Sequence, residues 1–253
     1  METPVSDIAQ EGVTEMTVER NHIYNCDCLL GMAEMPDDFI DLAIIDAPYG
    51  IGENRGQEKS RNINRVDRRN GKPIIINHPG YKIKSWDLKK PDKVFFDEVF
   101  RISKNQIIWG WNNYNQVHGA GRIFWDKCNG KSDFSDGEIA FCSLHESIRL
   151  FRFMWSGFCQ GRGILEGHIN QGNKTKCEKR IHPTQKPVAL YKWLLSNYAK
   201  PGDLILDTHM GSGSSYIACL DMGFDYIGFE IDADYFKGIE DRVYHFTRQR
   251  SLL

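Results

Sequence analysis

The sequence lacks any long apolar run. None of its segments approaches the roughly 20 consecutive apolar residues that span a bilayer, and residues 1–20 are polar, without the apolar centre of a secretory signal. Neither sign of charge dominates, since the formal net charge is -2. We therefore expect a cytoplasmic protein without a membrane partner, in which any contact with a polyanion depends on a local basic patch.

The seven cysteines lack the paired spacing of a metal site. Cys26 and Cys28 lie close together in the sequence, which is typical of a buried strand. A zinc site would need these two cysteines and a distant ligand such as His182. The odd number and the scattered positions favour reduced thiols, and we predict no metal.

Hydrophobic periodicity predicts one α/β domain. A chain of 253 residues with 41% hydrophobic content can fill a substantial core, and a continuous apolar run over 40–45 is typical of a strand covered on both faces. An antiparallel part is expected within 122–158, in an otherwise mostly parallel sheet. The expected strands are 22–27, 40–45, 106–110, 122–125, 139–143, 148–158, 204–206 and 226–229, and the expected helices are 29–35, 92–102, 187–198, 214–222 and 235–246.

Two segments, 53–84 and 160–180, are rich in lysine and arginine and poor in acids. A solvated surface loop is the alternative interpretation of such a charge run. A long insertion directly after a strand is, however, uncommon unless it is functional. We interpret both segments as loops that contact nucleic acid, through Arg55, Lys59, Arg61, Arg65, Arg68, Arg69, Lys174 and Lys176.

A turn of small residues, 207–213, lies between an expected strand and an expected helix. Its glycines let the backbone approach a ligand, and the helix N-terminus favours a carboxylate or phosphate. Glu230 ends the next strand, where a carboxylate can bind ribose hydroxyls. No third glycine completes the dinucleotide pattern GxGxxG, so S-adenosylmethionine fits better than a nicotinamide cofactor.

Two further motifs give the chain a family resemblance. Asp46-Ala47-Pro48-Tyr49 ends the strand at 40–45, and the run HPTQKP at 182–187 precedes the strand at 204–206. Followed by the Gly-Ser-Gly turn, they resemble β-class S-adenosylmethionine-dependent DNA amino-methyltransferases, over 22 to about 246. The resemblance implies a Rossmann-like class I methyltransferase fold, with a mostly parallel seven-stranded-type sheet, helices on both faces and a circularly permuted motif order.

The chain is expected to divide into two parts. Residues 1–20 are polar and have no clear period, which predicts a flexible arm. The resemblance implies a single methyltransferase domain over 21–253, with DNA-contacting loops inserted at about 53–90 and 160–180. S-adenosyl-L-methionine is the implied cofactor, with S-adenosylhomocysteine as its product. Its implied contacts are Asp27 near the adenine ring, Glu230 on the ribose, Thr184 and Lys186 at its border, and Asp207, Gly211, Ser212 and Gly213 around the methionine part.

The chemistry of amino-methylation gives the turn Asp46-Ala47-Pro48-Tyr49 a catalytic role. An exocyclic amine is a poor nucleophile, because its lone pair is delocalised into the ring. The Asp46 carboxylate and the Ala47 carbonyl can accept the two amine hydrogens, and the rigid Pro48 holds that carbonyl. Tyr49 can stack on a base flipped out of the duplex.

Some positions depart from the family or stay open. Ala47 stands where the family usually has proline, but its carbonyl is the group required. Thr208 and His209 stand where Pro and Phe are usual. A set of aromatic residues near the active site could flank the base or belong to the core: Trp109, Trp111 and Tyr114.

Adenine N6 is the favoured target. No proline is followed by cysteine, which disfavours methylation at carbon 5 of cytosine, and the initial Asp resembles adenine enzymes more than the Ser form of cytosine-N4 enzymes. The alternatives are cytosine N4, amino-methylation of RNA or of protein glutamine, and a non-catalytic DNA-binding module. Double-stranded DNA is the expected partner, and a homodimer and a cognate restriction endonuclease stay open.

Overall fold

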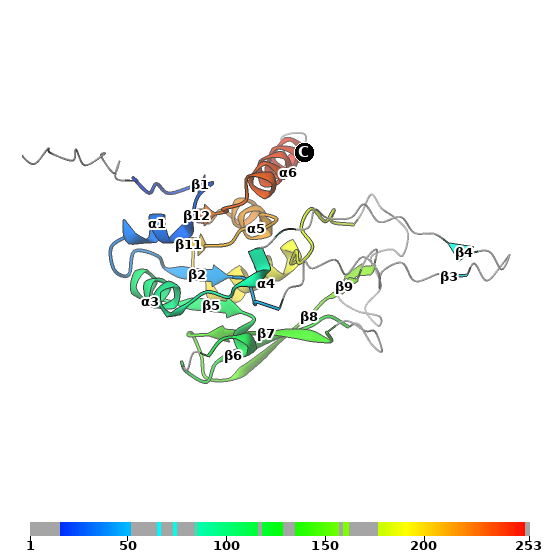
Figure 1. Ribbon diagram of the computed structural model, residues 1–253, viewed down its shortest axis with the longest axis horizontal. Helices are drawn as coiled ribbons and strands as arrows, with labels where there is room; N and C mark the ends of the chain where they lie inside the picture. The colour runs from blue at the N-terminus through cyan, green and yellow to red at the C-terminus, as the bar shows by residue number, and fades with distance from the viewer. Residues whose placement is uncertain are drawn as a thin grey trace, which may run out of the picture.

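An eight-stranded sheet forms the centre of the fold (Figure 1). The structure, a computed structural model, describes residues 16–51, 65–66, 73–74, 84, 86–115, 118–128, 135–156, 159–161 and 177–250. The strand order is β1 (His22–Tyr24), β12 (Asp225–Phe229), β11 (Leu204–Asp207), β2 (Leu42–Ile45), β5 (Gln106–Trp109), β7 (Gly137–Cys142), β6 (Arg122–Asp126) and β8 (Ile148–Arg152). Two short pairs lie outside it, β3 (Arg65–Val66) with β4 (Pro73–Ile74), and β9 (Met154–Ser156) with β10 (Cys159–Gly161).

The sheet is mostly parallel. From β1 to β5 every neighbouring pair is parallel, and β8 is parallel to β6. Within the eight strands, β7 alone runs against its neighbours β5 and β6. The predicted mostly parallel α/β sheet is therefore confirmed, with an antiparallel part limited to β7 and one strand more than the seven-stranded type that the resemblance implied.

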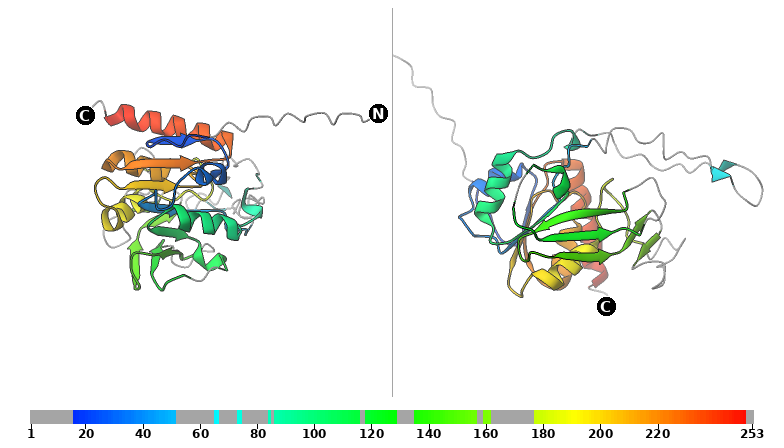
Figure 2. Two further views of the ribbon diagram at one scale, coloured as in Figure 1. Left: turned by 90° about the vertical axis from the view of Figure 1, so that its left-hand side faces the viewer. Right: turned by 90° about the horizontal axis from the view of Figure 1, so that it is seen from below.

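Helices cover both faces of the sheet, as the two views of Figure 2 show. The helices are α1 (Cys28–Ala33) and α3 (Lys93–Ile102) on one face, and α4 (Val188–Tyr198), α5 (Ser214–Met222) and α6 (Ala233–Arg250) on the other. On β2, Ala43 and Ile45 pack with buried side chains of α1 and α3, whereas Leu42 and Ile44 pack with those of the helices on the other face. Burial on both faces explains the continuous apolar run in the sequence of this strand.

The ends of the elements follow local side-chain chemistry. The carboxylate of Asp27 accepts a hydrogen bond from the main-chain N–H of Leu29 at 2.9 Å, and so caps α1. Asp232 caps α6 in the same way, which starts this helix before the predicted residue 235. The strand predicted over 148–158 breaks at Phe153, and β9 pairs with β10 outside the main sheet. Within the described part of the chain, no helix has both the length and the apolar character to cross a membrane.

Parallel strands bring their carboxyl ends to one edge of the sheet, which is where ligands bind in open α/β folds. Ala43 of β2 pairs with Leu206 of β11, so the residues that follow these two strands are neighbours. Asp46 follows β2, and Asp207 is the last residue of β11. The two turns singled out in the sequence therefore meet, although they are far apart along the chain.

Candidate active site

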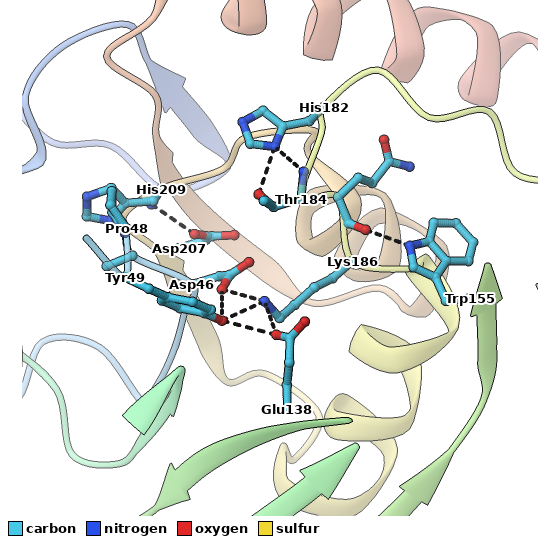
Figure 3. A network of polar contacts seen from close by, with 12 residues as sticks. Asp46, Pro48, Tyr49, Glu138, Trp155, His182, Thr184, Lys186, Asp207 and His209 are labelled. Atoms are coloured by element: carbon cyan, nitrogen blue, oxygen red, sulfur yellow. Dashed lines mark hydrogen bonds and ion pairs between the residues drawn. The ribbon is translucent and has the colours of Figure 1, made fainter. Parts of the chain in front are cut away.

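Asp46 lies at the centre of a buried polar network (Figure 3). Its Oδ1 atom accepts hydrogen bonds from Lys186 Nζ at 2.5 Å and from Tyr49 Oη at 2.8 Å. Lys186 Nζ also lies 2.9 Å from Glu138 Oε2 and 3.0 Å from Tyr49 Oη. The side chain of Lys186 is 3% exposed, so these contacts are shielded from solvent.

The start of helix α4 positions Lys186. Trp155 Nε1 donates a hydrogen bond to the Gln185 carbonyl at 2.6 Å (Figure 3), and the Gln185 side chain accepts one from the main-chain N–H of Ile181 at 2.8 Å. Pro187 then precedes the first helical residue. The resemblance placed Lys186 at the border of the cofactor. Within the described part of the chain, its ammonium group contacts Asp46, Tyr49 and Glu138.

Glu138 is a functional candidate that the sequence analysis missed. It lies near the start of β7, opposite Trp125 of β6, and its Oε1 atom is 2.5 Å from Lys127 Nζ. A carboxylate directly before the apolar residues of a strand was the available signal, but the partner of that carboxylate depends on which strands are neighbours.

The network separates the proton affinities of its two carboxylates. Burial raises the pKa of Asp46, and the negative charge of Glu138 raises it further, against the opposing effect of Lys186. Burial also opposes ionisation of Glu138, but the ammonium ions of Lys186 and Lys127 outweigh it and lower the pKa of Glu138 to about 2. Asp46 is therefore the carboxylate of this pair that takes up a proton more readily.

The rest of the predicted catalytic turn, Asp46–Tyr49, is held by aromatic residues. Ala47 is buried, and its carbonyl accepts a hydrogen bond from Tyr114 Oη at 2.8 Å. The rings of Tyr49 and Tyr114 meet edge to face at 6.3 Å between centroids. Of the three aromatic residues left open in the sequence, Tyr114 thus contacts the turn, Trp109 is buried with its ring 5.6 Å from Lys186 Nζ, and Trp111 stacks on Phe141.

The turn after β11 holds a second buried carboxylate, Asp207. Its Oδ2 atom accepts a hydrogen bond from Ser215 Oγ at 2.5 Å, and its Oδ1 atom accepts one from the His209 main-chain N–H at 3.0 Å. Burial raises the pKa of Asp207 to about 7, despite these hydrogen bonds. Ionisation of Asp207 near neutral pH therefore depends on what lies beside it.

Glu230 is joined directly to the glycine turn. Its Oε2 atom accepts a hydrogen bond from the Gly211 main-chain N–H at 2.8 Å, and its Oε1 atom accepts one from that of Asp232 at 2.9 Å. Both Gly211 and Gly213 have positive φ values, 52° and 70°, which favour glycine. Ser212 is buried within the same turn, and its carbonyl accepts a hydrogen bond from Arg242 at 2.7 Å.

A cavity opens between the catalytic turn and the N-terminus of α1. Asp27, Pro48, Phe95 and His209 contribute to its wall, together with residues 89–92. Burial lowers the pKa of His209 to about 4, so its imidazole is neutral at physiological pH. The His209 ring meets Phe95 at 5.4 Å, so the structure brings Asp27 and His209 to one cavity with an aromatic wall.

Thr184 lies apart from this cavity's lining, and its hydroxyl is 3.2 Å from His182 Nδ1. The His182 ring packs against Tyr235 at 4.3 Å between centroids. Lys84, the last basic residue of 53–84, pairs with Asp232 and, at 3.0 Å, with Asp234. The end of that basic segment therefore lies beside the turn that follows Glu230.

The predicted DNA contacts fall almost entirely outside the described residues. Of Arg65, the structure describes the main chain in β3 and nothing of the side chain. Residues 1–15 of the predicted arm also lie outside it. These assignments stay predictions, and the remaining residues concerned, likewise outside the described part, are Arg55, Lys59, Arg61, Arg68, Arg69, Lys174 and Lys176.

Comparison with known proteins identifies the family. A family model described as DNA methylase, of the N6/N4 type, matches residues 164–241. The type II methyltransferase M.HpaI of Haemophilus parainfluenzae is 33% identical over 232 residues, which cover 84% of this chain and 70% of the relative. The chain belongs to the DNA methylase family. The type II methyltransferase M.HinfI of Haemophilus influenzae is 26% identical over 269 residues, covering 88% of this chain and 68% of that protein.

A solved structure, an M1.HpyAVI–SAM complex, is 18% identical to this DNA methylase, with a TM-score of 0.46, and the match covers 87% of this chain and 98% of that one. Family membership confirms the resemblance drawn from the sequence motifs. The stretch that the family model matches contains the HPTQKP run, the glycine turn and Glu230, and the catalytic turn precedes it.

Proposed function

We propose that this DNA methylase transfers a methyl group from S-adenosylmethionine to N6 of a flipped adenine in a specific DNA sequence. The observation that carries the proposal is the meeting of two turns at one sheet edge. Asp46 follows β2, Asp207 ends β11, and these strands are parallel neighbours. An acceptor for an exocyclic amine is thereby next to a turn suited to a nucleotide-like ligand.

The residues of the second turn fit this cofactor. The cavity beside Asp27 and His209 has the aromatic wall that an adenine ring needs, and Glu230 is suited to ribose hydroxyls. The buried Asp207 is suited to the α-ammonium group of the methionine part. When bound, S-adenosylmethionine supplies an electrophilic methyl group on a sulfonium ion. Thr184, Lys186, Gly211, Ser212 and Gly213 complete the proposed contacts.

Asp46 and Ala47 prepare the amine for attack. Among the described residues, the hydrogen bonds to the Asp46 carboxylate all reach Oδ1, which leaves Oδ2 for one amine hydrogen. The Ala47 carbonyl has a second lone pair beside the one that Tyr114 uses, and accepts the other hydrogen. Both bonds favour a tetrahedral nitrogen with its lone pair directed at the methyl group, while Tyr49 stacks on the base.

Asp46 also accepts the proton that the methylated amine releases. The amine nitrogen gains the methyl carbon, the carbon–sulfur bond breaks to leave S-adenosylhomocysteine, and the positively charged nitrogen then loses one proton. Asp46 accepts that proton because burial raises its pKa, whereas the pKa of Glu138 near 2 keeps Glu138 ionised. Solvent receives the proton when the product leaves.

The initial Asp of the catalytic turn favours adenine, and cytosine N4 is the second candidate. Amino-methylation of RNA or of protein glutamine is less well supported, because family membership points to DNA. The proposed grip on DNA comes from the basic segments at about 53–90 and 160–180. A single domain over 21–253, a homodimer and a cognate restriction endonuclease remain predictions.

The experiment that tests this function is an assay with labelled S-adenosylmethionine and unmethylated double-stranded DNA, followed by digestion to nucleosides. We expect labelled N6-methyl-2′-deoxyadenosine. Asp46→Asn should abolish transfer, while Asp97→Asn, which removes an exposed carboxylate on α3, should not. Labelled N4-methyl-2′-deoxycytidine would correct the base, and an unlabelled digest would overturn the proposal.

A further inference from the structure

The ammonium group of Lys186 has three hydrogens, and the structure provides three acceptors for them. Nζ lies 2.5 Å from Asp46 Oδ1, 2.9 Å from Glu138 Oε2 and 3.0 Å from Tyr49 Oη. A lysine ammonium can donate three hydrogen bonds and accept none. One buried cation is therefore shared between two carboxylates, of which only Asp46 belongs to the catalytic turn.

This sharing matters for the charge on Asp46. A buried cation needs an ionic partner, because its desolvation is costly. If Lys186 had Asp46 as its sole carboxylate partner, the charge of Asp46 would be fully committed to that pair. The positive charge that develops on a substrate amine would then lie beside the neutral Asp46–Lys186 ion pair instead of an anion.

The position of Glu138 is fixed from its other side. Its Oε1 atom is 2.5 Å from Lys127 Nζ, and this ion pair turns Oε2 toward Lys186. Lys127 follows β6 and Glu138 lies on the neighbouring strand β7. Figure 3 shows Glu138 pointing from its strand toward the ammonium group of Lys186.

We propose that Glu138 is a positioning residue for methyl transfer, which shares the Lys186 ammonium with Asp46 and so leaves Asp46 with negative charge and a free oxygen for the substrate amine. The inference rests on the proposed function of Asp46. It assigns to Lys186 and Glu138 together a role in orienting the acceptor, in addition to the proposed contact of Lys186 with the border of the cofactor.

The pH dependence of the site follows from the groups that face Asp46. Lys186 favours its ionised form, and Glu138 disfavours it. Tyr49 donates a hydrogen bond to Asp46, and Asp207 is the other acid that interacts with it. The remaining neighbours, Tyr114 and Tyr191, have raised pKa values and stay neutral. Removal of the Glu138 charge should consequently make Asp46 easier to ionise.

The test uses Glu138→Gln, which removes the charge and keeps the shape of the side chain. In the full-length protein without DNA or cofactor, carbon-13 NMR of labelled aspartate carboxyls should show Asp46 titrating at lower pH in this variant than in the wild type. In the methylation assay, kcat should fall about tenfold or more, the acid limb of its pH profile should move to lower pH, and KM for the cofactor should change less than about twofold.

Two further variants separate positioning from stability. Asp126→Asn is a control at the end of β6, the strand next to β7, and removes the carboxylate that pairs with Arg152 at 2.9 Å. The acid limb of the kcat profile should stay at its wild-type position in this variant. The double variant, Glu138→Gln with Lys186→Met, removes both charges. Its acid limb should return toward the wild-type position. Its loss of kcat should be smaller than the product of the losses in the two single variants.

An unchanged Asp46 titration in a folded Glu138→Gln variant would overturn the inference, as would multiplicative rate losses in the double variant. If Glu138→Gln does not fold, Glu138→Asp and the double variant decide, since the inference requires the aspartate to retain the wild-type acid limb. Failure of the wild-type protein to methylate DNA would instead count against the proposed function, because the NMR titration does not depend on activity.

Discussion

The hydroxyl group of Tyr114 donates a hydrogen bond to the main-chain carbonyl of Ala47, with 2.8 Å between the two oxygen atoms. Related enzymes usually carry proline at the second position of this turn, and the proline ring restricts the backbone. Ala47 lacks this ring, although the following Pro48 still restricts its backbone. The hydrogen bond from Tyr114 holds the Ala47 carbonyl in addition.

Tyr114→Phe should therefore reduce methyl transfer. A net loss of about 1 kcal/mol, typical for one hydrogen bond, corresponds to about a fivefold decrease in kcat. Ala47→Pro should be close to neutral in the wild-type background and should restore activity in Tyr114→Phe, because the ring replaces the lost restraint. Steady-state kinetics of the four proteins would show this coupling, and a lack of restoration would refute the compensation.

Cofactor binding should depend on pH through Asp207, whose pKa is raised to about 7 by burial. The ionised carboxylate attracts the cofactor's ammonium group, so affinity should increase as the pH rises from about 6 to 8, with release of protons. Calorimetry in buffers of different ionisation enthalpy would measure that release. Asp207→Asn should bind more weakly with no release, and affinity that falls with pH would contradict the assignment.

The same group affects stability in the opposite direction. In the protein without cofactor, Asp207 binds a proton in the folded state at pH values where the unfolded chain has lost it. Its contribution to stability is therefore full below the ordinary pKa of about 4 and is lost as the pH rises through about 7. Thermal unfolding of the wild type, compared with Asp207→Asn between pH 5 and 8, should reveal this difference.

Gly110→Ala should displace Tyr49. A Cβ atom at Gly110 would lie 2.1 Å from Cε1 of the Tyr49 ring, and the φ of Gly110 is +70°. Gly202→Ala is a matched control, since Gly202 has φ +91° and open space around its Cβ position. Both variants should lose about 1–2 kcal/mol of stability through backbone strain, but Gly110→Ala alone should lose methyl transfer. Equal activities would show that Tyr49 tolerates the displacement.

Glu178 should stabilise the turn at 207–213 through Arg242, which donates a hydrogen bond to the Ser212 carbonyl. Its carboxylate pairs with the mostly buried Arg242 and accepts hydrogen bonds from Gln185 Nε2 and from the Val188 main-chain N–H, both at 3.0 Å. Glu178→Gln leaves the Arg242 charge without its partner, and should lower the unfolding free energy by about 2–3 kcal/mol, less than for a fully buried pair.

Urea denaturation would measure the effect of Glu178→Gln. Asp97→Asn breaks the exposed pair with Lys93, in which both side chains are more than half exposed, and should change stability by less than about 1 kcal/mol. A similar small change for Glu178→Gln would mean that water reaches Arg242 in the folded protein.

Sequence periodicity predicted the elements that lie within one strand or helix. Helix α5 begins and ends at the predicted residues, because Gly223 with φ 76° stops it. The resemblance also implied a catalytic role for the turn at Asp46 and a cofactor role for the turn at Asp207. That the two turns meet depends on β2 and β11 being neighbours, which the periodicity does not predict.

The contacts of Glu138 could not be derived in that way. Lys186 is 140 residues from Asp46 in the sequence. Glu138, the second carboxylate that contacts the Lys186 ammonium group, lies on β7, the antiparallel strand of the eight-stranded sheet. Nothing in the spacing of Glu138 predicts that β7 lies between β5 and β6. For the same reason, the sequence placed Tyr114 near the site without indicating its hydrogen bond to Ala47.

The pairing of strand β1 with β12 also sets when the protein can become functional during synthesis. His22 pairs with Ile227, and Asn25 donates a hydrogen bond to the Glu230 carbonyl, 205 residues away in sequence. Asp46 leaves the ribosome before its ammonium partner Lys186 and its neighbouring strand β11 are made. A growing chain therefore carries Asp46 in a strand without its final neighbour until residues 186–207 have been synthesised.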